Sequence, residues 1–539
     1  MTYLIIPALL PIVTALVLMC KFKVVPGKAM LISWGIAAFF AFTIWKLQFT
    51  GIAAASILGI FKSLDIIIII WGAILLLNVL RESHAIDTIN NSFFKISNDR
   101  RIQIIVIAWL FSGFIEGASG FGAAPALAAP LLAGLGFPVV IAVAASLICN
   151  TLPVPFGAVG IPAQTAVTTL SIPLAENGMN QAEFGKEMLN QLTLISGIPG
   201  VLTPLAAIVF MIIMTNSSRK LRSIVEIIPL ALFSGIAYVI PWRLTAIYLG
   251  PELPSMVGAI VGLPLTLLMI KFRIMVPKYV WDFPSGGEKI NTLAVSQNTV
   301  KIPVFQAWMP YILLAVILLV LRMPGSPCIN LFGKIQIILP ETFGVVNSGA
   351  SWKILNNPGL IPIALIALVS ALCWKIPFPG QWKVLKNTTN QVAMPAIAIA
   401  ASVAIVQIMI ATSSNPAELP GMLDCVAKTA ANTMGKAYLL ISPFIGIFGT
   451  FFAGSCTVSN ILFVPLQFNT ALLLDMEPAL AVAMQNIGGG LGSMIRISGV
   501  IAACATVKAN GQEGKIILLN SIPATIMALL AAITAYILG

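Results

Sequence analysis

Apolar segments long enough to cross a bilayer alternate with short polar segments along the whole chain. A helical crossing needs about 20 consecutive, mainly apolar residues. Two further regions, 117–165 and 454–507, are apolar but are interrupted by glycine, proline and polar residues. The pattern predicts an all-α polytopic membrane protein with about 12–14 transmembrane segments, some of them broken. The uninterrupted runs lie at about 2–20, 29–45, 64–80, 102–115, 189–214, 224–241, 254–272, 303–321, 359–374, 391–411, 436–453 and 516–538.

Composition supports this prediction and disfavours other classes of protein. Of the 539 residues, 59% are hydrophobic and 9% are charged, whereas a soluble domain carries about 25% charged residues. The net charge of +12 comes from short Lys and Arg clusters between the apolar runs. Such clusters are typical of orientation signals and of contact with anionic lipid. We therefore expect the lipid bilayer, and no nucleic acid, as a partner.

Residue types that usually hold metals or cofactors are scarce. The single histidine, His84, lies in a basic loop, and the seven cysteines have no metal-ligand spacing. We therefore expect no metal and no cofactor. Cys328 and Cys425 both fall in loops that we place outside the cytoplasm, and the sequence leaves their pairing open because it gives no geometry. It leaves the oligomeric state open as well.

The basic clusters predict an orientation, because cytoplasmic loops carry an excess of Lys and Arg. An even number of crossings can separate each cluster from the next, so all of them can lie inside. Both termini and the loops 323–358 and 414–435 are then outside, and the membrane is a plasma membrane (the bacterial inner membrane). The clusters lie at 21–28, 81–101, 219–222, 271–278 and 375–386.

A polar segment divides the chain near its middle. Residues 274–302 contain Pro284 and two adjacent glycines, and we interpret them as a cytoplasmic linker. The linker separates an N-terminal membrane half, 1–273, from a C-terminal membrane half, 303–539. Two other mixed polar segments, 81–101 and 172–188, are expected to be plain connectors.

The most unusual stretch is 112–164, which begins SGFIEGASGFG and later contains CNTLPVPFGAVGIP. It places a carboxylate, Glu116, in an apolar context of membrane scale. An ionisable group at that depth costs roughly 2.5–3.5 kcal/mol on insertion scales, and it usually faces a cavity. We interpret the stretch as half of a solute-binding site. The structural alternative is a glutamate permanently paired with a cation that holds two helices together.

Residues 436–507 repeat this pattern. A shift of 336 residues places Ser119 on Ser455 and Asn150 on Asn486, so the step from serine to asparagine is 31 residues in both copies. With the predicted orientation, the two copies enter the membrane from opposite faces. Inverted repeats with interrupted helices or re-entrant segments are typical of secondary transporters. Close packing of small residues is the alternative, and it explains the glycines but not Glu116, the asparagines and Arg496.

Four motifs carry a family resemblance: FIEGASGFGAAPALAAPLLAGLGF, CNTLPVPFGAVGIP, GSCTVSN and QNIGGG. They resemble those of the lactate permease family of bacterial secondary transporters and cover about a quarter of the chain. The resemblance implies a divergent member that takes up lactate, and often glycolate, by symport with protons. The family has an aspartate where this chain has Cys456, and a lysine where it has Ser493. Arg496, one helical turn further along, would supply the missing cation.

Roles follow from the resemblance and from the residue types. Glu116 is expected to carry the proton, since burial disfavours the charged form of a carboxyl group. Substrate-binding groups are expected at both breaks, where backbone N–H groups at helix N-termini attract anions. Asp65, Arg243 and Gln407 are expected to be interfacial or structural, and interhelical hydrogen bonding is the alternative role of the two asparagines. The expected substrate-binding residues are Ser119, Gly120, Gly122, Asn150, Ser455, Thr457, Ser459, Asn460, Asn486 and Arg496.

The sequence thus predicts a proton symporter for a small monocarboxylate such as L-lactate, D-lactate or glycolate. A sodium-coupled or differently specific organic-anion carrier is the alternative, which the cysteine at position 456 keeps open. A membrane-embedded enzyme is disfavoured, because the chain has one histidine and no carboxylate cluster. A channel is disfavoured because two broken repeats are typical of alternating access.

Overall fold

The computed structural model describes the chain except residues 1–3, 21, 23, 94–95, 121, 216–219, 284–301, 323–333, 346–347, 358, 510 and 539. Most of the predicted linker 274–302 therefore lies outside the described residues, and so does Cys328. The division into two halves and the pairing of Cys328 with Cys425 stay predictions.

Every uninterrupted apolar run forms a helix over its described residues. Several helices are longer than the runs: α3, α11 and α17 have 34 residues each, or about 51 Å at 1.5 Å per residue. The helices that correspond to the runs, apart from 102–115, are α1 (Ile5–Cys20), α2 (Pro26–Thr43), α3 (Phe49–Glu82), α11 (Gln181–Met214), α12 (Lys220–Leu249), α13 (Pro254–Lys271), α14 (Val304–Arg322), α16 (Leu365–Cys373) with the turn before it, α17 (Phe378–Ala411), α19 (Tyr438–Ala453) and α23 (Glu513–Leu538).

The number of crossings depends on how short and bent helices are counted. In the described part of the chain, ten helices are long and apolar enough to cross a membrane, or up to eleven if the bent pair Val139–Cys149 and Val154–Thr169 is one span. The predicted about 12–14 segments also include shorter apolar helices such as Val304–Leu314 and Tyr438–Phe451. The two polar connectors are partly helical, since α4 (Ala85–Phe93) lies in one and α10 (Ser171–Glu176) in the other.

Residues 100–134 form a hairpin, the first hairpin. A continuous helix runs through α5 (Arg100–Gln103), the π-helical segment Ile104–Phe111 and α6 (Ser112–Ser119), and α7 (Ala123–Gly134) follows the break. The guanidinium of Arg100 donates to the backbone carbonyl of Leu135, so the start of the hairpin lies beside its end. The first hairpin therefore enters and leaves on the same side, with its tip at Gly120–Gly122.

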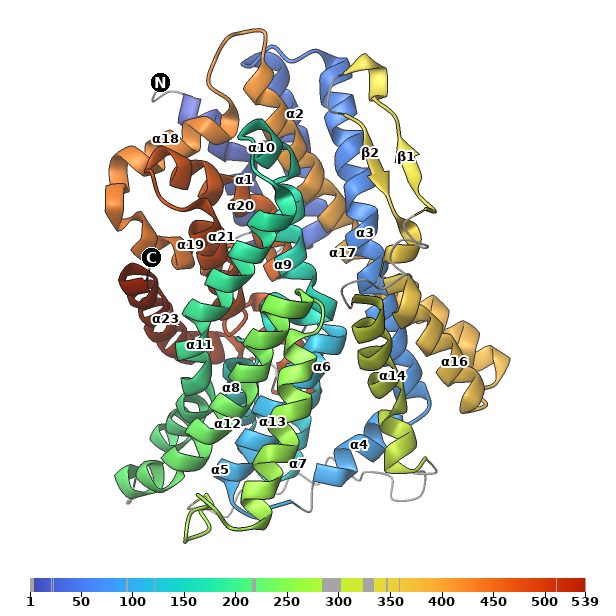
Figure 1. The fold of residues 1–539 in the computed structure, drawn as a ribbon, viewed down its shortest axis with the longest axis vertical. Helices are drawn as coiled ribbons and strands as arrows, with labels where there is room; N and C mark the ends of the chain where they lie inside the picture. The colour runs from blue at the N-terminus through green and yellow to red at the C-terminus, as the bar shows by residue number, and fades with distance from the viewer. Residues whose placement is uncertain are drawn as a thin grey trace.

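A broken helix, the first broken span, follows the first hairpin. α8 (Val139–Cys149) and α9 (Gly157–Thr169) are separated by a short turn, and the two halves are bent by 66°. This span connects the side on which the first hairpin begins to the side on which α10 and the start of α11 lie (Figure 1). Together with α11, it gives the even number of crossings that the predicted orientation requires between the clusters 81–101 and 219–222.

The second repeat has the same two parts. In the second hairpin, α19 and α20 (Cys456–Leu473) run antiparallel, since the Tyr438 hydroxyl donates to Gln467 Oε1 (2.6 Å) and the Ser459 hydroxyl donates to the Gly446 carbonyl (3.2 Å). Its tip is at Gly454–Ser455. The second broken span comprises α21 (Pro478–Gly492) and α22 (Ile497–Thr506).

The two repeats are inverted with respect to each other. α7 of the first hairpin packs against α22, and α9 packs against α20 of the second hairpin. α7 lies toward the bottom of Figure 1, whereas α18 (Met422–Met434), α19 and α20 lie toward the top. Each hairpin thus approaches the centre from its own end of the molecule. The prediction of inverted repeats with interrupted helices or re-entrant segments is confirmed.

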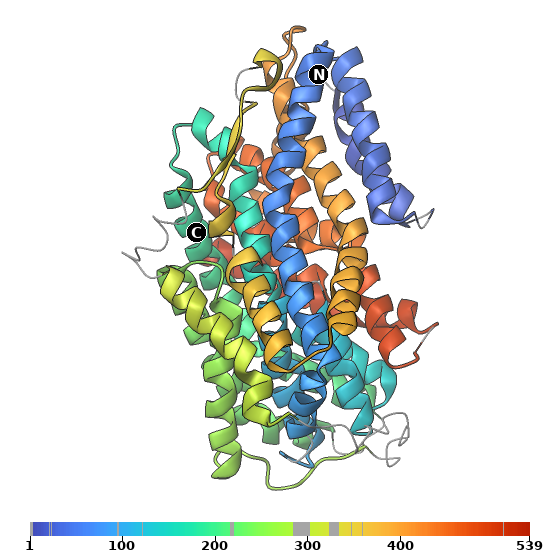
Figure 2. The ribbon, with the colours of Figure 1, turned by 90° about the vertical axis from the view of Figure 1, so that its right-hand side faces the viewer.

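Long helices from both ends of the sequence surround the repeats. α17 packs along α2 and α3, and α11 packs on α12 and α21; Figure 2 shows α3 beside α17. A short antiparallel sheet, β1 (Ile337–Leu339) and β2 (Ala350–Trp352), lies against α3. Asp65 accepts hydrogen bonds there from Trp352 Nε1 (2.8 Å) and Asn357 Nδ2 (2.7 Å), which is the interfacial role expected for it.

Four of the basic clusters meet at one end of the molecule. Lys383 pairs with Glu82 (3.2 Å), and Arg100 pairs with Asp282 (2.8 Å). Arg101 donates to the carbonyl of Tyr279 (2.7 Å), and the guanidinium of Arg222 lies over the Tyr279 ring, 4.7 Å from its centroid. Arg243 has the structural role expected for it, because it donates to Asn190 and Thr193 and joins α12 to α11.

Candidate functional site

The tips of both hairpins and the breaks of both spans converge on one small buried cavity, the central cavity. The volume open to the centre of a water-sized sphere is about 20 Å³, which is room for about one water molecule. A solute larger than a water molecule would therefore need the lining of the cavity to rearrange before it could enter. The lining residues are Glu116, Gly120, Val154, Gly157, Ala158, Pro162, Ser455, Cys456, Thr457 and Arg496.

Glu116 supplies the carboxylate of the central cavity. Its side chain is 3% exposed, and its Oε2 accepts a hydrogen bond from Asn150 Nδ2 (3.1 Å). Asn150 ends α8, so this bond ties the tip of the first hairpin to the break in the first broken span. A Cβ atom at Gly157 would lie 2.9 Å from Glu116 Oε1. The lack of a side chain at Gly157 thus lets the carboxylate approach the backbone of the break.

Arg496 supplies the cation and comes from the break between α21 and α22. Its side chain is 6% exposed, and its Nε has no hydrogen-bond partner in the described structure. The guanidinium lies so close to Gly122 that a Cβ atom there would collide with it; Gly122 also has a left-handed backbone, with φ of 83°. Both Glu116 and Arg496 line the cavity, yet no direct ion pair joins these two described residues.

The N-terminus of α20 points at the same cavity. Gly454 has a left-handed backbone, and Ser455 begins the helix without a capping bond from its side chain. The first backbone N–H groups of a helix lack partners within the helix and carry a partial positive charge. Since Ser455, Cys456 and Thr457 line the cavity, this end of α20 is suited to an anion.

The break in the first broken span has a strained backbone. Ala158, Val159 and Gly160 are all left-handed, with φ of 45°, 58° and 78°. For residues with a Cβ atom this conformation costs roughly 1–2 kcal/mol each, and it is rarest for β-branched residues such as valine. A hydrogen bond from Gln164 Nε2 to the Val159 carbonyl (3.2 Å) helps to hold it. Strain of this kind clusters at functional sites.

Three of the expected substrate-binding residues lie in a polar network away from the cavity lining. Ser459 accepts from Gln485 Nε2 (3.0 Å), and Asn460 Nδ2 donates to Asn486 Oδ1 (2.7 Å) and to the Pro162 carbonyl (3.0 Å). Their bonds join α19, α20, α21 and α9. Ser119, another expected residue, is buried at the end of α6 directly before the tip.

The structure therefore brings only part of the expected set together. Glu116, Gly120, Ser455, Thr457 and Arg496 line the cavity, whereas Asn150 and Gly122 contact it through Glu116 and Arg496. Five lining residues were not among the expected site residues. One is Cys456, and the other four lie in the motif PVPFGAVGIP, whose proline and glycine content was the signal for them. They are Val154, Gly157, Ala158 and Pro162.

The two departures from the family pattern have different surroundings. Cys456 lines the cavity, at the position where the resemblance implies an aspartate. Ser493 is buried and donates to the carbonyl of Gly490 (2.6 Å), so it is satisfied within its own helix. Arg496 is thus the one cation that lines the cavity among the described residues.

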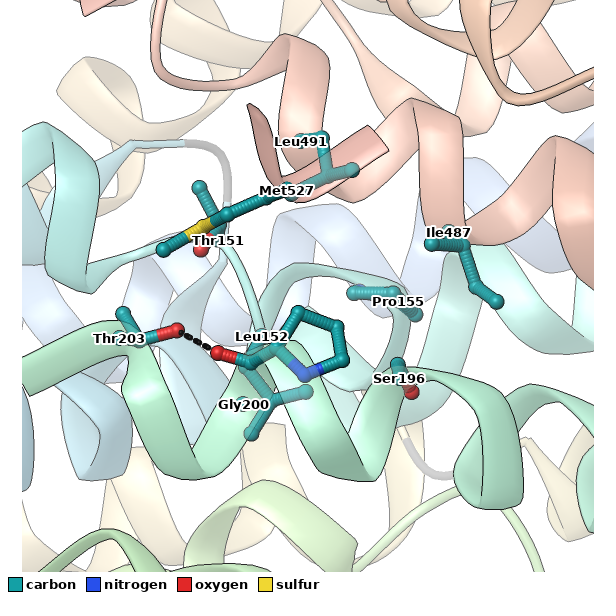
Figure 3. Close-up of a pocket in the computed structure, with 10 residues that line it drawn as sticks. Thr151, Leu152, Pro155, Ser196, Gly200, Thr203, Ile487, Leu491 and Met527 are labelled. Atoms are coloured by element: carbon teal, nitrogen blue, oxygen red, sulfur yellow. Dashed lines mark hydrogen bonds between the residues drawn. The ribbon is translucent and has the colours of Figure 1, made fainter. Parts of the chain in front are cut away.

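A neighbouring pocket lies behind the first break, between α11, α21 and α23 (Figure 3). Leu152, Ile487, Leu491 and Met527 give it an apolar surface, and the Thr203 hydroxyl is bonded to the carbonyl of Pro199 (2.9 Å). Its volume, measured in the same way, is about 20 Å³. The hydroxyls of Thr151, Ser196 and Thr203 in its lining all donate to backbone carbonyls, and its described lining includes no charged residue.

Known proteins resemble this chain over nearly its full length. The family model described as L-lactate permease matches residues 4–539. The L-lactate permease of Bacillus subtilis is 31% identical over 481 residues, which are 83% of this chain and 79% of that protein. The glycolate permease GlcA of Escherichia coli is 28% identical and covers 94% of this chain and 91% of its own length.

Among solved structures, the Alcanivorax borkumensis YdaH transporter matches with 13% identity and a TM-score of 0.40, over 87% of this chain and 84% of that chain. The relatives above are permeases, so this chain is a multi-pass membrane transporter and not an enzyme. The family match spans the chain from its first helix to its last residue, and the chain therefore belongs to the L-lactate permease family.

Proposed function

We propose that the protein imports a small 2-hydroxymonocarboxylate, such as L-lactate or glycolate, together with one proton. The observation that carries the proposal is the pair of opposite charges at the central cavity. Glu116 and Arg496 are the two charged residues among its described lining residues, and both are buried. The printed names of the relatives, L-lactate permease and glycolate permease, support the choice of substrate.

Charge balance links the substrate to the proton. With Glu116 ionised, the cavity holds one negative and one positive charge. A bound monocarboxylate would then leave one uncompensated negative charge, which is costly in a buried site. Protonation of Glu116 restores neutrality, so the substrate anion and one proton are stable in the site together. Binding of the substrate anion alone, or of the proton alone, would leave a net charge in the buried site. Each is therefore disfavoured without the other, which is the requirement for coupling.

The substrate contacts follow from the groups that lack partners. Arg496 would bind the carboxylate through its guanidinium, which fits carboxylates with two parallel hydrogen bonds. The N-terminus of α20 would add backbone N–H groups from the opposite hairpin. Asn150 Oδ1 has no hydrogen-bond partner in the described structure and would accept the 2-hydroxyl of the substrate.

The orientation belongs to the same proposal. We place the end of the molecule at which the basic clusters meet in the cytoplasm, with both chain termini outside. The supporting contacts are those of Glu82, Asp282 and Tyr279 with the basic residues of that end.

Uptake of labelled L-lactate into proteoliposomes tests the coupling. An inward proton gradient should drive accumulation by the unchanged protein, and a sodium gradient without a pH difference should not. Glu116→Gln should lose pH-driven accumulation but keep exchange of labelled for unlabelled lactate, because the neutral amide resembles the protonated carboxyl group. Accumulation driven by sodium alone would establish the alternative, a sodium-coupled carrier. Full pH-driven accumulation by Glu116→Gln would refute the role of this residue.

A further inference from the structure

A second and larger cavity, the entrance cavity, lies between α3, α9, α17 and β2. The volume open to the centre of a water-sized sphere is about 380 Å³, compared with about 20 Å³ for the central cavity. The entrance cavity can therefore hold a small organic acid with its water without any change in the structure. It has an exposed rim, which includes Lys353, and a buried floor that includes Gln407.

The entrance cavity is lined by side-chain hydrogen-bond donors that do not all have a partner within the described structure. Gln407 is 3% exposed, and its Nε2 has no partner in the described structure. Lys62 Nζ donates one hydrogen bond, to the Ser171 hydroxyl (3.0 Å), and an ammonium group has three N–H donors. An unpartnered buried amide is costly, so a ligand that accepts hydrogen bonds from Gln407 and Lys62 would be stabilised here.

The charges of the entrance cavity favour an anion. Two of its lining residues are cationic, Lys62 and Lys353, and one is anionic, Asp65. Asp65 already accepts hydrogen bonds from Trp352 and Asn357. These bonds keep its carboxylate beside β2 and the turn that follows β2. Lys62 has no ion-pair partner among the described residues. A carboxylate next to Lys62 would therefore meet a cation that no protein carboxylate neutralises.

One helix separates the entrance cavity from the central cavity. Gln164 lines the entrance cavity, and its Nε2 donates to the Val159 carbonyl in the left-handed turn Ala158–Gly160. Ala158, the neighbour of Val159, lines the central cavity. An acid in the entrance cavity thus lies against the same segment of α9 that forms the wall of the central cavity.

We propose that the entrance cavity is a second binding site for the transported monocarboxylate, which Lys62 and Gln407 hold by its carboxylate before it reaches Arg496. The inference rests on the proposed function, since it assumes that the substrate is a small organic anion. In the proposed orientation the site lies on the outer side of the break, because Lys62 is nearer the start of α3 at Phe49 than the end of α3 at Glu82. It captures the substrate from outside and raises its local concentration at the break.

Uptake kinetics with L-lactate test the site. Lys62→Gln should raise KM about tenfold, as expected for the loss of one charged hydrogen bond, and should leave kcat within about twofold. Lys62→Arg should restore most of the affinity, since it keeps the charge. Gln407→Leu, which removes the donor at similar volume, should raise KM in the same direction. The matched control is Lys428→Gln, because Lys428 is an exposed lysine on α18 that does not line the cavity.

Two outcomes of the uptake assay overturn the proposal. One is an unchanged KM in Lys62→Gln, provided that the unchanged protein takes up lactate. The other is an equal rise of KM in Lys428→Gln, which would mean a general effect of charge. Size-exclusion profiles of the purified variants establish that each one is folded.

Equilibrium binding separates this proposal from the proposed function. Arg496→Gln protein should not transport lactate but should still bind labelled L-lactate at one saturable site, and adding Lys62→Gln should weaken that binding about tenfold. No saturable binding to Arg496→Gln protein would overturn the entrance site. If the unchanged protein takes up no lactate, the proposed function fails, and this binding measurement still decides whether the entrance cavity holds the acid.

Discussion

The two inverted repeats share one outline but differ in the chemistry of their interiors. In the second repeat, Gln467 accepts from Tyr438 and Ser442 and donates to Gln485, so neutral side chains cross-link α19, α20 and α21. In the first repeat, the buried carboxylate of Glu116 receives one side-chain hydrogen bond, from Asn150, and the adjacent backbone is left-handed.

This difference indicates a division of labour. A buried polar network whose members are hydrogen-bonded to one another makes a structure more rigid. We therefore interpret the second repeat as the rigid wall of the central cavity, where it places the N-terminus of α20 and, after α21, the cation of Arg496. The first repeat holds the ionisable acid and the strained turn, which in the proposed mechanism are the parts that change state during transport. The inverted symmetry brings the wall and the acid to the same cavity from opposite sides.

The comparison depends most on Arg496, the charge of the second repeat. Arg496→Gln removes the proposed carboxylate anchor and leaves Glu116 without an opposite charge, so lactate uptake should fall by at least about 100-fold. Lactate uptake by Arg496→Lys should fall less, because lysine keeps the positive charge but cannot bind a carboxylate through two parallel hydrogen bonds. Initial rates of uptake at several lactate concentrations measure both. Uptake by Arg496→Gln at a tenth of the normal rate or more would contradict the assignment.

Two glycine substitutions should separate the roles of the repeats. Gly157→Ala places a Cβ atom 2.9 Å from Glu116 Oε1, and the displaced carboxylate should lower uptake by about 10–100-fold with little loss of stability. Gly488→Ala collides with the Pro443 carbonyl and should destabilise the second hairpin by ~1–3 kcal/mol. Thermal melting of the purified proteins, followed together with uptake, distinguishes the two. The reverse pattern would disprove the division of labour.

The two asparagines at equal spacing provide a finer test. Asn150→Ala removes the proposed partner of the substrate hydroxyl, so the preference for lactate over propionate should narrow by about two- to tenfold. Asn486 is bonded to Asn460 and to the carbonyl of Val482, and Asn486→Ala should leave that preference unchanged. Competition of unlabelled lactate and propionate with labelled lactate measures the ratio. An equal change in both variants would mean that Asn150 has no special role.

The smallest effect on uptake is expected in the amide network. Gln467→Leu removes the group that bonds Tyr438, Ser442 and Gln485 and should lower the free energy of unfolding by ~1–3 kcal/mol. Uptake per folded molecule should change by less than about twofold, since Gln467 does not line the central cavity. A large loss of uptake with a normal melting temperature would place the network in the transport pathway.

Hydropathy alone predicted the spanning helices, because twenty apolar residues have few other stable conformations. The repeat was also visible, and the structure places Ser119 and Ser455 at the two hairpin tips. The equal spacing from each serine to Asn150 and to Asn486 does not give the two asparagines equivalent positions in the structure. Asn150 ends α8, whereas Asn486 lies inside α21, before the break that starts at Ser493.

The reason is that glycines do two different things in membrane helices. Gly488 and Gly489 stay helical, and their lack of side chains lets α21 pack directly on the backbone of α19 and on Cys456. Such close packing is the known use of small residues between membrane helices. Sequence shows a glycine in both cases, but only the partner helix decides whether the chain breaks there.

The entrance cavity could not be predicted either. Gln407, Lys62 and Gln164 come from three helices that are far apart in the sequence, and each alone is an ordinary polar residue in an apolar run. Gln407 was expected to be structural or interfacial. The structure adds that its amide faces a cavity without a partner, and this fact depends on how α17 packs against α3.

The π-helical segment Ile104–Phe111 lies directly before the short helix that carries Glu116. Its turns close between residues five apart instead of four, so it holds more residues per turn than the α-helix that continues it. In an α-helix each residue turns the chain by about 100°. Because the wide π-helical turns can tighten to α-helical ones, deleting one residue there, such as Ala108, would leave the direction of Glu116 nearly unchanged, whereas deleting one residue of the α-helical turn that follows, such as Gly113, would swing it by about 100°, away from Asn150 and Arg496. In evolutionary terms, this buried π-helical segment is a place where the helix can gain or lose one residue and still present the acid to the cavity.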